Sequence, residues 1–176
     1  LDSLHIALEQ YAVSDSYDKH LEYLKRFPYR NLFKEYDAKV ITSEYLIENI
    51  EYSFKVWRET PWGKYVSFDN FCEFILPYRI KDEPLTHWKK DFYHRFKPVL
   101  DSLYQGTDVV EATSCLSNYA TSLHWKYQNE LTGPHLSAQL LLELQLGDCT
   151  SIADFGCYML RSVGIPAGID TYLWSP

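Results

Sequence analysis

The sequence contains no apolar run long enough to cross a membrane. A transmembrane helix needs about 20 consecutive apolar residues, whereas the run Leu140–Leu142 ends at once at Glu143. No signal-peptide pattern is visible either. However, the chain begins with Leu1 rather than Met, so we expect that a natural N-terminus has been removed. The missing signal therefore leaves the cellular location open.

Motifs for metal, redox or nucleic-acid chemistry are also absent. The four cysteines, at positions 72, 115, 149 and 157, form no C-x-x-C pair, and the six histidines show no H-E-x-x-H spacing. We therefore expect no metal and no cofactor, while the disulfide status stays open. Lysine and arginine form no cluster and the formal net charge is −7, so nucleic acid is not an expected partner.

Aromatic residues are abundant, at 16% of the chain, and 46% of all residues are hydrophobic. This composition argues against disorder. We interpret the aromatic residues first as an amphipathic core. A surface that stacks on sugars or peptides is the alternative interpretation.

Apolar residues recur mostly at helical spacing, as Leu46, Ile50 and Phe54 do. Caps and breakers then set the limits of the segments. We expect helices over 3–12, 17–27, 42–54, Ser67 to Pro77, Pro84 to Gly106, Asp108 to Leu123, Ser137 to Leu146 and Cys149 to Gly164, with a loop over 57–63. Alternating apolar positions predict a strand only at the end, over Ile165–Leu173. The chain is thus expected to be mostly α.

Cys149 stands at the start of the last of these helices. Gly147 permits a tight turn before it, and Gly164 and Pro166 end the helix. The first-turn N–H groups and the helix dipole favour a negative charge there. Such a position lowers the pKa of a thiol in general and supplies N–H donors for an oxyanion. The alternative is that Cys149 is a small buried hydrophobe, as we expect Cys157 to be.

The residues around Cys149 resemble the transglutaminase-like superfamily. The resemblance rests on Gly147-Asp148-Cys149, Ala153, Leu160-Arg161 and Gly164-Ile165-Pro166-Ala167. It implies a papain-like α+β fold in which Cys149 is the catalytic nucleophile. It also implies a helical N-terminal region over 1–107, followed over 108–176 by a transglutaminase-like core truncated before its histidine and acid strands.

A softer resemblance covers the segment from Phe71 to Arg79, together with Glu83-Pro84-Leu85 and Trp88. It is similar to the helical N-terminal part of some Bacteroidetes transglutaminase-like proteins. Those proteins are commonly exported, so the resemblance implies a bacterial, extracytoplasmic protein, which is secreted, periplasmic or surface-anchored. We interpret Arg79 and Glu83 as anchors of the helical part rather than as catalytic residues.

The sequence departs from the superfamily pattern after Cys149. No histidine follows it, and Asp170 lies too early to be the acid of the family. We expect both partners to lie beyond Pro176 and this chain alone to be inactive. His124 or His135 could replace the missing catalytic histidine only if the catalytic residues came in another order along the chain. Gln145 and Trp125 are oxyanion-hole candidates by residue type only.

Three functions remain open at this point. The first is a thiol hydrolase or acyltransferase in the intact protein, in which Cys149 attacks an amide carbonyl of a peptide or protein substrate. The second is a non-catalytic module on the same scaffold that binds a peptide or glycan. The third is a partner-binding role for residues 1–107. The residues do not distinguish hydrolysis from cross-linking, and they do not indicate the oligomeric state.

Overall fold

A computed structural model describes residues 36–127 and 135–170 of the chain. This part is mostly helical, with two very short strands. In chain order its elements are α3 (Asp37–Val40), α4 (Ser43–Glu59), a 3-10 turn (Gly63–Tyr65), α5 (Phe68–Phe74), α6 (Trp88–Leu103), α7 (Val109–Thr121), β1 (Lys126–Tyr127), α8 (Ala138–Leu144), β2 (Leu146–Gly147) and α9 (Cys149–Ser162). The helices expected over 3–12 and 17–27 lie outside the described residues.

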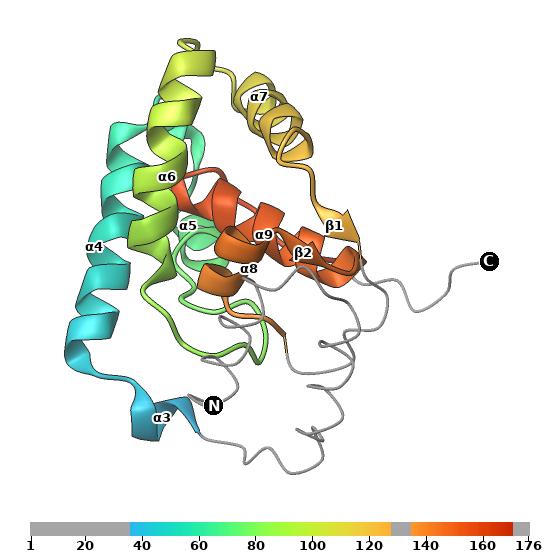
Figure 1. Ribbon diagram of the computed structural model, residues 1–176. Coiled ribbons are helices and arrows are strands. Elements are labelled where there is room, and N and C mark those ends of the chain that lie inside the picture. The colour runs from blue at the N-terminus through green and yellow to red at the C-terminus, as the bar shows by residue number, and fades with distance from the viewer. Residues whose placement is uncertain (1–35, 128–134, 171–176) are drawn as a thin grey trace.

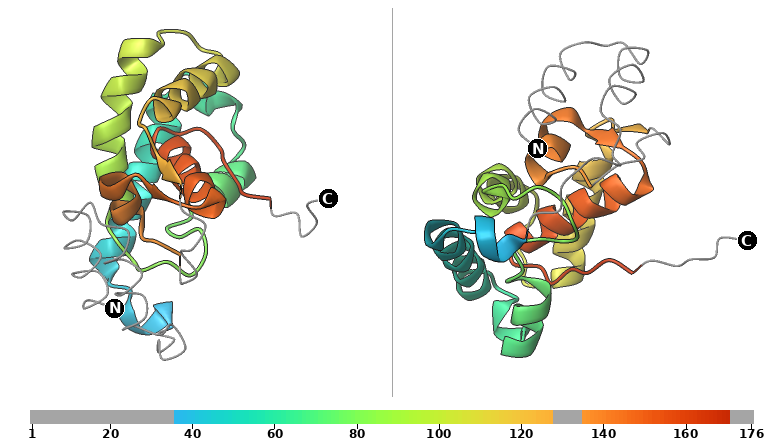
Figure 2. Two further views of the ribbon diagram at one scale, coloured as in Figure 1. Left: turned by 45° about the vertical axis from the view of Figure 1, so that its right-hand side comes forward. Right: turned by 90° about the horizontal axis from the view of Figure 1, so that it is seen from below.

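Helix α9 occupies the middle of the arrangement. Helices α4 and α6 run side by side, and α9 lies across them with α7 and α8 packed against it (Figure 1). The view from below shows the same crossing along the length of α9 (Figure 2). Within the described ranges, no helix is both long enough and apolar enough to span a membrane.

The helix starts follow the caps that the sequence predicts. Asp108 accepts hydrogen bonds from the N–H groups of Val110 and Glu111, and Ser67 and Ser137 each accept one from the third residue of their own helix. Each cap satisfies a first-turn N–H that has no partner inside the helix. The sequence therefore places the starts of α5, α7 and α8 correctly.

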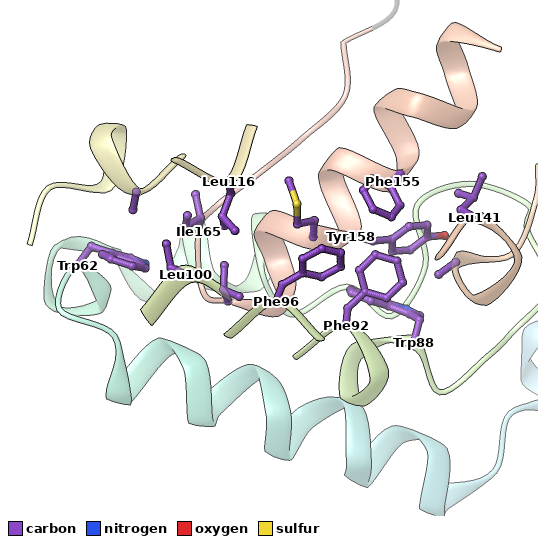
Figure 3. Close-up of a cluster of buried hydrophobic side chains, with 14 residues drawn as sticks. Trp62, Trp88, Phe92, Phe96, Leu100, Leu116, Leu141, Phe155, Tyr158 and Ile165 are labelled. Atoms are coloured by element: carbon purple, nitrogen blue, oxygen red, sulfur yellow. The ribbon is translucent and has the colours of Figure 1, made fainter. Parts of the chain in front are cut away.

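Aromatic side chains from α6 and α9 form the centre of the core (Figure 3). Phe92 of α6 lies 5.6 Å from Phe155 and 5.7 Å from Tyr158, both of α9, between ring centroids. Residues from the other segments complete the cluster. Its buried members are Trp62, Trp88, Phe92, Phe96, Leu100, Ala112, Leu116, Ala138, Leu141, Phe155, Tyr158, Met159, Val163 and Ile165. The interpretation of the aromatic residues as core residues holds for this cluster.

Two buried charged side chains tie the helices together. The Glu83 carboxylate accepts hydrogen bonds from the Ile80 and Lys81 N–H groups and from the Tyr158 hydroxyl of α9. It is therefore the anchor that the sequence suggested. Lys89 of α6 donates to the Ser53 hydroxyl of α4 at 2.6 Å and to the carbonyl of Ile75, just after α5, at 2.7 Å. Burial lowers the pKa of the Lys89 ammonium, and these acceptors compensate part of its lost hydration.

Three expectations on secondary structure were wrong in detail. The helix expected from Pro84 begins at Trp88, because the Glu83 carboxylate closes a separate turn with the preceding N–H groups. Helix α4 runs on to Glu59, so the loop over 57–63 is shorter than expected. Residues 165–170 form no strand, since the Ala167 N–H donates to Phe74 and the Ala167 carbonyl accepts from Arg161. The end of that expected strand lies outside the described residues.

The proposed division at residues 107 and 108 stays a prediction. Helix α6 lies before this position and α9 after it, yet both contribute to one hydrophobic cluster. Any unit that begins at 108 would therefore leave part of its core on the other side of the boundary.

The hydroxyl of Tyr158 is expected to contribute measurably to stability. Tyr158→Phe removes a buried donor that lies 2.6 Å from the Glu83 carboxylate, and such a loss costs about 1.5–3 kcal/mol. Urea unfolding measures the change. Tyr65→Phe is the control, because Tyr65 is 74% exposed and should change stability by less than about 0.5 kcal/mol. Equal effects in the two variants would contradict the anchoring role of the Glu83–Tyr158 pair.

Candidate functional site

Cys149 is the first residue of α9 and its side chain is exposed. The interpretation of Cys149 as a buried hydrophobe is therefore wrong. Cys157, two turns further along the same helix, is buried as expected. Burial raises the pKa of the Cys157 thiol, whose sulfur lies 3.6 Å from the Ala167 carbonyl oxygen. The Cys149 and Cys157 thiols thus differ in solvent exposure and in their surroundings.

The turn before Cys149 is built by Gly147 and Asp148. Asp148 is the N-cap, and its Oδ1 accepts from the Ser151 N–H at 2.9 Å and from the Ser151 hydroxyl at 3.0 Å. Gly147 has a φ of 156°, and a Cβ there would collide with the Ser151 side chain. A glycine is therefore required at this position for the cap to close.

Strand β2 leads directly into this turn. It pairs in parallel with β1, with Lys126 opposite Leu146 and Tyr127 opposite Gly147. Gln145 ends α8 in the left-handed region, at a φ of 50°, and its carbonyl accepts from the Lys126 N–H at 2.9 Å. Two-residue strands carry no periodic signal, so the sequence did not indicate this pairing.

The local geometry suits a nucleophile with an oxyanion site beside it. The cap uses the N–H of Ser151, while the N–H groups of Cys149 and Thr150 have no acceptor among the described residues. These groups stand at the positive end of a helix of 14 residues. They can therefore donate to an oxygen that becomes negative when the Cys149 sulfur attacks its carbon.

No described histidine is bonded to Cys149, and three of the four have other partners. His87 contacts Glu48, His94 contacts the Tyr52 hydroxyl and His135 contacts Asp154. His124 is exposed, in the left-handed region. Among the described residues, no hydrogen bond or ion pair joins a histidine to Cys149. The other two histidines of the sequence lie outside those residues.

The two oxyanion-hole candidates also have structural positions. Trp125 packs on the core, with its ring centroid 4.8 Å from that of Phe155. Gln145 is the end cap of α8, where its backbone conformation is its visible contribution. The geometry assigns neither side chain to the Cys149 site.

An ionic cluster on α9 escaped the sequence analysis. Asp154 is only 2% exposed, and its Oδ2 lies 2.7 Å from His135 Nδ1. Its Oδ1 lies 3.7 Å from Lys81 Nζ. Burial raises the pKa of the Asp154 carboxyl, and His135 and Lys81 act in the opposite direction. The sequence did not predict that Asp154 is buried, because its partners His135 and Lys81 lie in distant segments.

Metal binding has no candidate in this part of the protein. Across the described ranges, His, Cys, Asp and Glu side chains form no group of three or more that is arranged to hold an ion.

Part of the chain matches the model of a known protein family. Residues 101–175 match the family model of the transglutaminase-like superfamily. This region of the chain is similar to that superfamily, as the motif around Cys149 predicted. The match does not reach the segment 71–88, whose resemblance to Bacteroidetes proteins stays a prediction. No curated protein and no solved structure matches the chain.

The negative charge of Asp148 is expected to slow the reaction of its neighbour. Asp148→Asn keeps an N-cap side chain and removes a like charge beside the thiolate. Iodoacetamide labelling of Cys149 at pH 7 should become about threefold faster, because a negative charge next to the reacting sulfur is removed. Mass spectrometry of the Cys149 peptide measures the rate. Asp108→Asn, at the cap of α7, is the matched control and should leave the rate unchanged. Unchanged labelling in both variants would show that Asp148 does not act on the thiol.

Proposed function

We propose that Cys149 is the nucleophile of a transglutaminase-like acyl-transfer enzyme that acts on amide groups of peptides or proteins. The observation that carries this proposal is the exposed thiol at the first residue of α9, within the region that matches the superfamily. A thiol in that position is reactive because the helix end favours its anion.

The proposed reaction has two steps. The Cys149 thiolate attacks the carbonyl carbon of an amide, and the first-turn N–H groups hold the oxygen that becomes negative. The intermediate collapses with loss of an amine, which takes up a proton, and a thioester remains on the sulfur. Water or a second amine then attacks the thioester and restores the thiol. Water gives hydrolysis, and an amine gives cross-linking.

The second half of the machinery is an acid–base group. Expulsion of the amine needs a proton donor near Cys149, and histidine is the usual one in thiol enzymes. Among the described residues, no histidine makes a hydrogen bond or ion pair with Cys149. We therefore propose that the histidine and its acid lie outside the described residues, and that this chain by itself acylates slowly and turns over poorly.

A non-catalytic binding role is the second candidate. Its support is an aromatic pair formed by the partly buried Trp57 and the exposed Phe68, with ring centroids 6.0 Å apart. Exposed aromatic rings of this kind can stack on a sugar or a peptide side chain. An extracytoplasmic location fits either role and stays a proposal.

Acylation by an activated ester tests the nucleophile directly. The full chain is incubated with an activated phenyl ester, and digestion followed by mass spectrometry locates the acyl group. We expect the thioester to form on Cys149 far faster than on the buried Cys157, because the first thiol is exposed. Cys149→Ser should abolish the fast adduct.

Cys115→Ser provides the matched control. Cys115 is a partly buried cysteine within a helix of the same region, so its replacement should leave the adduct on Cys149 unchanged. Equal acylation of all exposed and partly buried thiols, or none on Cys149, would remove the support for an enzyme. Peptide or glycan binding that depends on Phe68 would then favour the binding module.

A further inference from the structure

The cluster around Asp154 lies on the helix of the nucleophile but has no part in the chemistry proposed above. We propose that the pair formed by His135 and Asp154 is a clamp that positions the Cys149 turn. This inference rests on the proposed function only where it treats Cys149 as the nucleophile. His135 and Asp154 are thus positioning residues.

The clamp closes a loop of chain that contains the site. His135 and Asp154 are 19 positions apart, and α8, β2 and Cys149 all lie between them. His135 precedes the cap of α8, and Asp154 lies in the second turn of α9. A contact at these two positions fixes both ends of the segment that carries the nucleophile, and it reduces the conformations open to that segment.

The segment inside the loop needs such support. Gln145 adopts a left-handed backbone and Gly147 has a positive φ. A left-handed conformation costs a non-glycine residue on the order of 1 kcal/mol, and it persists where the surrounding structure enforces it. The pairing of β1 with β2 holds this backbone conformation from one side. The contact between His135 and Asp154 holds the two ends of the segment that contains it.

Several charged groups lie around the clamp. Asp154 faces His135 from α9, while Lys81 and Asp82 approach from the turn that precedes α6, with Asp82 Oδ1 3.8 Å from His135 Nε2. Glu83, on the same turn, adds negative charge near Asp154. Acidic groups thus outnumber Lys81, the one fixed cation that the structure shows in this cluster. The His135 ring therefore supplies a hydrogen-bond partner for a nearly buried carboxylate, whose burial is costly without one.

Hydrogen exchange of backbone amides tests the clamp without any activity assay. In the full chain at pH 6, His135→Gln should make the amides of α8 and β2 exchange about fivefold faster. His124→Asn is the matched control, because His124 is an exposed histidine and asparagine tolerates its left-handed backbone. Amides of α4 report global stability and should change less than those of α8. Equal acceleration in α4 and α8, or none in either, would overturn the proposal.

Asp154→Asn gives a second variant in which the same contact loses its charge. Amides of α8 and β2 should again exchange faster, and those of α4 should change less. Unchanged exchange in both variants would contradict the clamp even if Cys149 is acylated as proposed. Conversely, faster exchange of α8 and β2 in both variants without acylation of Cys149 would leave the clamp in place and remove the enzyme.

Discussion

The packing of α9 against α6 is the contact on which the rest of the structure depends. Phe155 and Tyr158 lie against Phe92, and the same cluster receives side chains from α7 and α8. Large buried aromatic side chains contribute more apolar area than other residues. With this face buried, α9 has one orientation, and its first residue is held at the surface. The position of Cys149 is thus a consequence of packing that occurs two turns away.

Buried polar groups fix this packing in one register. Glu83 accepts the Tyr158 hydroxyl and two N–H groups of its own turn, so the segment before α6 is attached to the back of α9. Lys89 joins α4 and the end of α5 to α6. Hydrophobic contacts alone tolerate small shifts, whereas a buried charge left without its partners is costly. Glu83 and Lys89 lie at opposite ends of one short segment of chain. Both therefore fix the packing of the helices around α6.

Local signals in the sequence predicted local structure well. The caps at Ser67, Asp108 and Ser137 were found because a cap is a property of adjacent residues. The start of α9 and the superfamily match of its region followed from the same kind of signal. Contacts between distant segments were missed. The pairing of β1 with β2 and the contact of His135 with Asp154 depend on the fold as a whole, and two-residue strands or a single histidine leave no pattern to detect.

The conformations that are unfavourable by themselves gather around Cys149. Gln145 is left-handed, Gly147 admits no side chain, Asp148 sets a negative charge beside a thiol and Asp154 is a buried carboxylate. Elsewhere such features are more scattered, as the buried Lys89 of α6 and the left-handed His124 are. Local rules are broken most often where a site requires it, since stability alone would remove such features. Their concentration within ten residues, next to an exposed thiol, therefore supports a functional role for this turn independently of the family match.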